Sequence, residues 1–172
     1  MYSKDSINDF TIIILSLNRH NYLERILEFY ENYDVNIKIV DSSINRFHSN
    51  ILLKQNIEYI HIPNMEILDK VIYALEDIKT KYVVFCADDD FIFVDAIKSC
   101  CSFLENNHDY VCAQGRLITF KYSTKDNELE FIIENYFKIG EDKITSSNVV
   151  TRLLNFSNPY RHTFYGVHRT DN

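Results

Sequence analysis

The chain has 172 residues, of which 46% are hydrophobic and 14% aromatic, and it carries 18 basic against 25 acidic side chains. This length and apolar content are sufficient for the core of one globular domain. The net charge of −7, without a cluster of Lys and Arg, excludes proteins that follow a nucleic-acid backbone over many phosphates. Three glycines are too few for the phosphate-binding loops of P-loop and GxGxxG proteins.

The cysteines and the N-terminal region bear on the compartment of the protein. No CxxC pair and no paired histidine spacing accompany the cysteines, which indicates buried thiols in a reducing compartment and not a zinc site. The apolar run from Thr11 to Leu17 is too short for a signal peptide or a membrane span. We therefore expect a cytoplasmic protein without a transmembrane segment. A peripheral position at the inner face of the membrane is left open.

The first part of the chain predicts strands that alternate with helices. The continuous β-branched run Phe10–Leu17 is typical of a strand buried on both faces. Apolar side chains at helical spacing predict an amphipathic helix over residues 20–32. Strands are predicted at residues 36–41 and 57–62. A second helix follows, and its predicted buried stripe consists of Leu68, Val71, Ile72, Leu75 and Ile78.

The alternation continues to about residue 113. Residues 81–86 and 110–113 are predicted strands, and residues 94–105 are a predicted helix. The inward side chains of that helix are expected to be Val94, Ile97, Cys101 and Leu104. Together these elements predict an open, mostly parallel α/β sheet with helices on both faces, as in Rossmann-like folds.

After Gly115 the pattern changes. Residues 116–122 and 128–136 are separated by the polar segment STKDN, which predicts an antiparallel hairpin that could extend the sheet. A short helix is predicted at residues 147–155.

Polar residues follow the predicted strands at positions where open α/β sheets bind their ligands, outside the carboxyl ends of the strands. These candidate binding residues are Asn18 and Arg19, then Asp41, Ser42 and Ser43, and finally Asp88, Asp89 and Asp90.

The triple aspartate Asp88–Asp90 gives the strongest signal. Adjacent carboxylates beside a hydrophobic strand repel one another and lose hydration unless a cation or hydrogen-bond donors compensate. Hard oxygen ligands suit Mn²⁺ or Mg²⁺, which keep coordination positions for substrate phosphates. We predict that these residues bind such an ion. The alternative is that one aspartate caps the helix that begins near Phe93 and the others are solvated.

The other candidates also have two interpretations each. Asp41 fits an Asx-type turn as well as a ligand contact. Asn18 and Arg19 fit a turn, although the planar guanidinium of Arg19 also suits a phosphate or a base. Lys70, beside the predicted buried stripe, is interpreted as a solvated helix charge, with a phosphate contact as the alternative.

The segments TIIILSLNRHNYLERIL, IVDSS and YVVFCADDDFI, in this order, resemble the family 2 glycosyltransferases of the GT-A fold over roughly residues 10–110. The resemblance implies a site for a nucleoside-diphosphate sugar, with a UDP-sugar favoured. It also implies that Asp41 contacts the base and that Asp88–Asp90 hold a metal on the diphosphate and touch the ribose. It further implies that Asn18 and Arg19 lie beside the nucleotide. Ser42 and Lys70 are additional candidate nucleotide contacts.

The resemblance implies direct displacement at the anomeric carbon with inversion, in which a base deprotonates the acceptor hydroxyl. Three departures from the family pattern concern the site. The glycine- and arginine-containing segment that the family often carries before the metal strand is absent, which leaves Lys70 as its stand-in. Ala87 stands where the first acid of the metal motif is often found, so the metal-binding pair among Asp88–Asp90 stays open. The family's base lies well after the metal motif, and Asp171 is the acidic residue near that distance.

The resemblance also suggests the organisation of the chain. We expect one domain over residues 1–172, with a nucleotide-sugar-binding half at about 10–114 and the start of an acceptor-side region at about 115–172. The acceptor would be a saccharide or a lipid-linked molecule. Residues 164–170 resemble the start of the acceptor side, and a homodimer through this surface is left open.

Two other functions compete with the transferase. A nucleotide-sugar-binding or assembly module could keep the donor site without a catalytic base. A haloacid-dehalogenase-like phosphatase would use the aspartates as an Asp-x-Asp nucleophile motif, but its later Ser/Thr, Lys and paired-Asp elements cannot be assigned.

Overall fold

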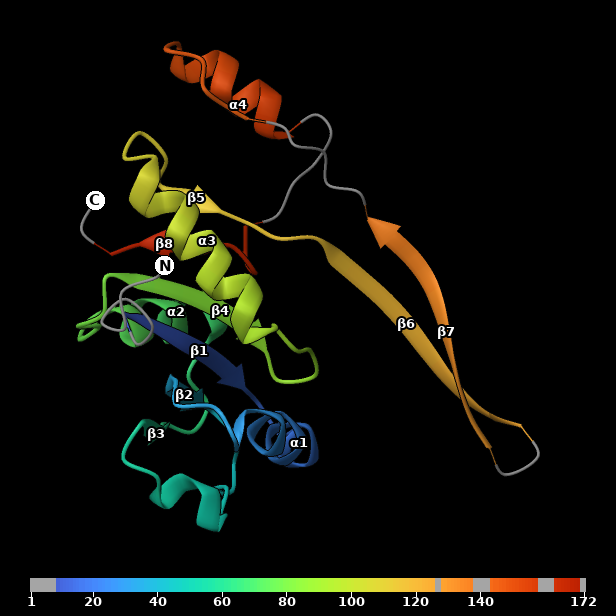
Figure 1. Ribbon diagram of the computed structural model, residues 1–172. Helices are drawn as coiled ribbons and strands as arrows, with labels where there is room; N and C mark the ends of the chain where they lie inside the picture. The colour runs from blue at the N-terminus through green and yellow to red at the C-terminus, as the bar shows by residue number, and fades with distance from the viewer. Residues whose placement is uncertain (1–8, 126–127, 138–142, 158–162, 171–172) are drawn as a thin grey trace. The chain divides into compact units, whose positions relative to one another are not determined.

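A computed structural model describes residues 9–125, 128–137, 143–157 and 163–170 of the chain (Figure 1). The chain divides into two compact units: one runs up to Ala113 and resumes at Thr163, and the other lies within Gln114–His162. In the described ranges, no helix is both long and apolar enough to span a membrane.

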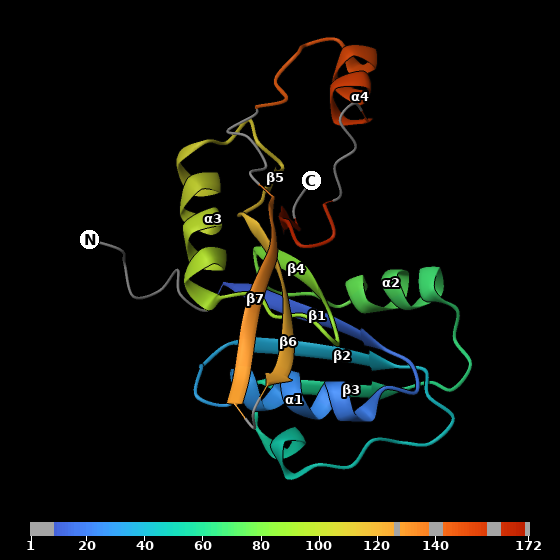
Figure 2. The same cartoon turned by 90° about the vertical axis from the view of Figure 1, so that its right-hand side faces the viewer.

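The first unit is built on a six-stranded sheet with the strand order β3-β2-β1-β4-β8-β5. Its strands are β1 (Phe10–Ser16), β2 (Asn36–Asp41), β3 (Ile57–His61), β4 (Tyr82–Ala87), β5 (Cys112–Ala113) and β8 (Val167–Arg169). The strands β1 to β4 pair in parallel, and β8 is antiparallel to both β4 and β5. The arrowheads of β1, β2 and β3 point the same way in Figure 2. The predicted open, mostly parallel sheet is therefore confirmed, whereas β8 was not predicted.

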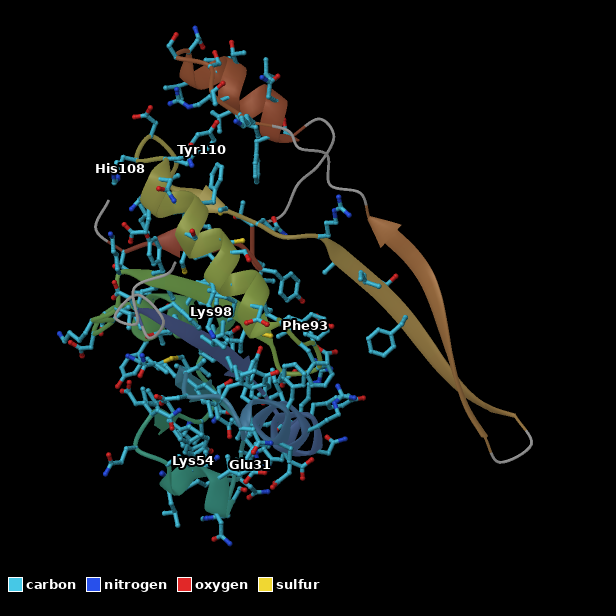
Figure 3. All side chains as sticks on the ribbon, viewed as in Figure 1. Glu31, Lys54, Phe93, Lys98, His108 and Tyr110 are labelled. Atoms are coloured by element: carbon cyan, nitrogen blue, oxygen red, sulfur yellow. The ribbon has the colours of Figure 1, made fainter. Side chains whose placement is uncertain are left out.

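Helices cover both faces of this sheet, as the sequence predicts. On one face, α1 (His20–Tyr30) and α3 (Val94–Asn106) pack over the apolar side chains of β1, β2 and β4 in one core cluster. On the other face, Ala74 of α2 (Ile67–Leu75) packs with Ile13 and Leu15 of β1 in a second cluster. Figure 3 labels Glu31 and Lys54, whose contact joins the end of α1 to the 3₁₀ helix η2 (Asn50–Leu53). The predicted inward side chains of α3 are confirmed as buried.

The predicted buried stripe of α2 is confirmed only in part: Val71 and Ile78 are partly buried, but Leu68, Ile72 and Leu75 are exposed. The helix buries Lys70 and Ala74, with Val71 partly buried beside them. Leu68 and Ile72 are 72% and 61% exposed. Apolar periodicity failed here because the orientation of α2 is set by a polar contact, in which the Lys70 ammonium reaches the carbonyl oxygen of Ser16 at 2.9 Å. The interpretation of Lys70 as a solvated helix charge is wrong, because its exposure is 3%.

The second unit contains β6 (Leu117–Lys125), β7 (Glu128–Phe137) and α4 (Val149–Ser157). The strands β6 and β7 pair antiparallel, as the predicted hairpin requires, with a register irregularity between Thr119 and Phe120. They form a two-stranded sheet of their own and add no strand to the six-stranded sheet. The helix predicted at residues 147–155 is α4.

A tight turn returns the chain to the first unit at β8. The amide N–H of Gly166 donates to the carbonyl of Thr163 at 2.8 Å. The next residue, Val167, is 1% exposed and pairs with Val84 of β4. A side chain at Gly166 would place its Cβ 2.6 Å from Cys112 Sγ and 3.0 Å from the Thr163 carbonyl oxygen. The turn therefore requires glycine for lack of space.

We expect Gly166→Ala to lower the free energy of unfolding by about 1–3 kcal/mol, because the added methyl group overlaps Cys112. Gly115→Ala is the matched control, since a Cβ at Gly115 meets nothing within 4 Å and should leave stability nearly unchanged. Urea unfolding measures both. Adding Cys112→Ala to Gly166→Ala should recover part of the loss, and no recovery would contradict the steric explanation.

Candidate active site

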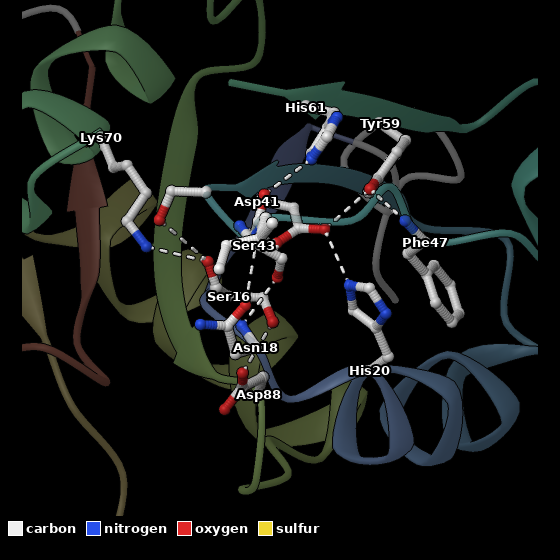
Figure 4. Close-up of polar contacts among 12 residues, drawn as sticks. Ser16, Asn18, His20, Asp41, Ser43, Phe47, Tyr59, His61, Lys70 and Asp88 are labelled. Carbon is white, nitrogen blue, oxygen red and sulfur yellow. Dashed lines mark hydrogen bonds and ion pairs between the residues drawn. The ribbon is translucent and has the colours of Figure 1, made fainter. Parts of the chain in front are cut away.

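The carboxyl ends of β1, β2 and β4 meet at one edge of the sheet. Their register places Ser16 opposite Asp41 and Leu15 opposite Ala87, the residue before Asp88. The Ser16 hydroxyl donates to Asp88 Oδ2 at 2.8 Å, which joins the ends of β1 and β4 (Figure 4). The predicted strand-end residues are thus brought together at a single place.

Asp41 is the centre of the hydrogen-bond network at the end of β2. Its side chain has no exposed surface, and its Oδ1 accepts from both the amide and the hydroxyl of Ser43. Its Oδ2 accepts from the Tyr59 hydroxyl at 2.7 Å and lies 3.3 Å from His20 Nε2 (Figure 4). Burial alone would raise the pKa of Asp41, but the donors of Ser43 and Tyr59 and the nearby His20 hold it below its usual value.

The loops after β1 and β2 are tied to each other. Asn18 adopts a left-handed backbone with φ of 55°, which asparagine tolerates better than most residues. Its amide donates to the Ser43 hydroxyl at 2.7 Å, and its side-chain oxygen accepts from the Ile44 amide at 3.2 Å. Ser42 is buried, and its amide donates to the Ser16 carbonyl at 3.0 Å. Both predicted residues therefore shape the loops at the site.

The three carboxylates after β4 have different surroundings. Arg19 bridges Asp88 at 3.1 Å and Asp89, to which its Nη2 donates. Asp90 is exposed and accepts from the hydroxyl of Tyr165. Burial raises the pKa of Asp88 and the charge of Asp89 adds to the effect, while Ser16 and Arg19 offset part of it. Asp88 is therefore a carboxylate whose ionisation the fold opposes.

Side chains from α1 fix the loop that carries these aspartates. The Arg25 guanidinium donates to the Asp89 carbonyl at 2.8 Å and lies over the ring of Phe91. The Tyr30 hydroxyl donates to the Ile92 carbonyl at 2.9 Å. Arg25 and Tyr30 thus hold the loop through its backbone carbonyls and do not occupy the aspartate carboxylates.

No three His, Cys, Asp or Glu side chains gather as a metal-ligand cluster within the described residues. Asp88 and Asp89 both pair with Arg19, whereas Asp90 accepts a hydrogen bond from Tyr165. The predicted ion would therefore depend on ligands from the substrate, and its binding stays a prediction.

Lys70 is buried near the carboxylates of Asp41 and Asp88. Its ammonium donates to the Ser16 carbonyl, and burial lowers its pKa while the charges of Asp41 and Asp88 act in the opposite direction. Lys70 therefore places a positive charge beside the carboxylates at the ends of β2 and β4.

Sequence reasoning missed Ser16, His20, Tyr59 and Tyr165, and also Arg25 and Tyr30, which hold the aspartate loop. Ser16 was within reach of the sequence, because it is the polar residue that ends an otherwise apolar strand. Tyr59 contacts the site from β3 and Tyr165 from the turn before β8, so no local signal reveals these contacts. Asp171, the predicted base, lies outside the described residues.

The family model for glycosyl transferase family 2 matches residues 11–162. The chain belongs to glycosyl transferase family 2. The resemblance seen in the sequence is thereby confirmed. A search of curated proteins finds no match.

Solved structures show the same fold. S. aureus TarS 1-349 is similar with a TM-score of 0.57 and 14% identity, over 94% of this chain and 47% of that one. The complex of TarS 1-349 with UDP gives a TM-score of 0.55 at 15% identity, over 94% and 46% of the two chains. Its complex with UDP-GlcNAc gives 0.52 at 15% identity, over 94% and 45%. The chain spans about half the length of these neighbours, and the likeness confirms the predicted α/β fold.

We expect Asp41→Asn to lower the free energy of unfolding at pH 7 by about 1–3 kcal/mol, because an amide cannot accept all the hydrogen bonds that the carboxylate accepts. The pKa of Asp41 is lowered in the fold, so the ionised group stabilises the protein above pH of about 4 and loses this effect as the pH falls further. Urea unfolding at several pH values should show the gap to wild type narrowing toward acid pH. A gap that widens toward acid pH would contradict this assignment.

The same change at Asp88 should have the opposite effect. Because the folded chain raises the pKa of Asp88, its ionisation costs stability as the pH rises through that pKa. We expect Asp88→Asn to raise the free energy of unfolding at pH 7, with Asp41→Asn as the matched comparison. A loss of stability in both variants would show that the Arg19 ion pair outweighs the cost of burying Asp88.

Proposed function

We propose that the chain is a glycosyltransferase that binds a nucleoside-diphosphate sugar at the carboxyl ends of β1, β2 and β4 and transfers the sugar to an acceptor hydroxyl. The observation that carries this proposal is the joining of Ser16, Asp41 and Asp88, with Lys70 beneath them, into one polar cluster at that edge. Membership of glycosyl transferase family 2 supports it. The UDP and UDP-GlcNAc complexes of TarS favour a UDP-sugar as the donor.

The base of the nucleotide would bind at the end of β2. Asp41 is fully buried and its two oxygens already accept hydrogen bonds, so a base N–H can reach the carboxylate only if one donor leaves. His20 is the donor that can leave, because its 3.3 Å contact is the longest and its side chain is 32% exposed. We propose that a base with a ring N–H replaces His20 on Asp41 Oδ2.

The diphosphate would bind between α1 and the triple aspartate. Arg19 is 40% exposed and carries several N–H donors in a plane, so it can turn from Asp88 and Asp89 toward phosphate oxygens. Lys70 is buried beneath Ser16 and would act through its charge. This assignment gives both cations a role in holding the anionic donor.

The acidic residues present fit a divalent cation that is shared with the substrate. Mg²⁺ and similar ions are usually held by one or two carboxylates together with substrate phosphates and waters, so a cage of three side chains is unnecessary. Asp90 is the exposed carboxylate of the three and is not paired with Arg19, so we propose it as the principal ligand. The bound cation would supply positive charge that stabilises the departing nucleoside diphosphate.

Transfer would proceed by direct displacement with inversion, as the family resemblance implies. The residue that deprotonates the acceptor hydroxyl stays a prediction, with Asp171 as the candidate. The acceptor is proposed to be a saccharide or a lipid-linked molecule.

Calorimetric titration with UDP, GDP and UDP-GlcNAc, each with and without Mn²⁺, tests the donor site. We expect UDP to bind more tightly with Mn²⁺, and we expect Asp90→Asn to reduce this gain by about 10-fold or more because the ion loses a carboxylate. Asp95→Asn is the matched control, since the Asp95 side chain on α3 is 97% exposed and makes only a 3.9 Å surface ion pair.

A transfer and hydrolysis assay with UDP-GlcNAc then separates an enzyme from a binding module. Binding without release of UDP would favour the nucleotide-sugar-binding or assembly module. Failure of every nucleotide to bind, with or without Mn²⁺, would refute the proposed donor site.

A further inference from the structure

Tyr165 brings a distant part of the chain to the triple aspartate. Its hydroxyl donates a hydrogen bond to Asp90 Oδ2, although the two residues are 75 positions apart in the sequence. The contact forms because β8 pairs with β4, the strand that leads into the aspartates. The C-terminal segment of the first unit therefore contributes directly to the candidate site.

The Tyr165 hydroxyl is placed by a well-anchored turn. Gly166 closes the turn onto Thr163, and Val167 is buried in the sheet on the other side of Tyr165. Before it, the ring of Phe164 packs against Phe85 of β4 with 5.6 Å between the ring centroids. Since the residues on both sides of Tyr165–Gly166 are packed in place, the backbone of Tyr165 is fixed within reach of Asp90.

Asp90 is thereby held by one oxygen only. Within the described part of the chain, its second carboxylate oxygen receives no hydrogen bond, and the residue is exposed. Carboxylates that bind metals are typically oriented by a hydrogen bond to their other oxygen, and loss of such a partner typically reduces metal affinity by about 10- to 100-fold. A phenol is protonated at neutral pH and can act as this donor.

We propose that Tyr165 is a positioning residue of the donor site, whose hydroxyl holds the Asp90 carboxylate so that its second oxygen can bind a divalent cation on the diphosphate. This inference rests on the proposed function, because it requires the cation that the donor site would use. It assigns to the C-terminal turn a part in donor binding, in addition to closing the sheet.

The test compares the affinity for UDP in excess MnCl₂ with the affinity in EDTA, by calorimetry on the whole chain. We expect Tyr165→Phe to reduce the gain from Mn²⁺ by about 10-fold while the affinity in EDTA stays unchanged. The metal-free arm serves as the check on folding, because a purely structural defect would weaken both arms. Tyr33→Phe is the matched control, since Tyr33 lies after α1 and is 42% exposed.

A double-mutant cycle with Asp90→Asn tests the route of the effect. If the hydroxyl acts through the carboxylate, Tyr165→Phe should have no further effect on the Mn²⁺ gain once Asp90 is changed. Additive losses would overturn the inference, as would a Tyr165→Phe variant with the full Mn²⁺ gain. If wild type itself gains no affinity from Mn²⁺, the proposed metal site is refuted, and the inference with it. If wild type gains affinity and Tyr165→Phe keeps the full gain, only the inference is refuted.

Discussion

The parallel pairing of β1 with β2 and β4 is the constraint on which the rest of the structure depends. Because the three strands run in the same direction, the residues that follow them lie at one edge of the sheet. The strand β1 is apolar on both faces, so alternation of polar and apolar residues cannot fix its register. Ser16 can fix the register, because its hydroxyl donates to Asp88 and its carbonyl accepts from the Lys70 ammonium. The polar cluster therefore helps to align the strands that create it.

The cluster also determines how α2 packs. Burying a lysine is costly unless opposite charges and acceptors surround it, and the Ser16 carbonyl together with Asp41 and Asp88 meets that need. The helix is rotated to bring Lys70 inward, which leaves Leu68 and Ile72 exposed. A buried polar cluster that overrides the apolar pattern in this way produces a local conflict between sequence and fold, and such conflicts are expected at functional or strained sites.

The sequence was most informative where burial follows a simple period. The strands β1 to β4, the inward face of α3 and the three polar strand ends are all local patterns of apolar and charged residues. The face of α2 was not predictable, because its packing depends on partners in β1 and β4. The strand β8 was also missed, since three residues are too few for a period and its pairing with β4 links distant segments. The contact of Tyr165 with Asp90 depends on that pairing.

The fold shifts the pKa values of two carboxylates at the same edge in opposite directions. Asp41 is surrounded by donors that favour its charge, so it organises the loops after β1 and β2 whether or not a ligand is present. Asp88 is buried beside Asp89, and its charge is opposed by the fold in spite of Arg19. Under the proposed function, a cation that arrives with the diphosphate would remove this opposition. Part of the energy of donor binding would then come from relief of the cost of burying the Asp88 charge, to which the neighbouring Asp89 adds.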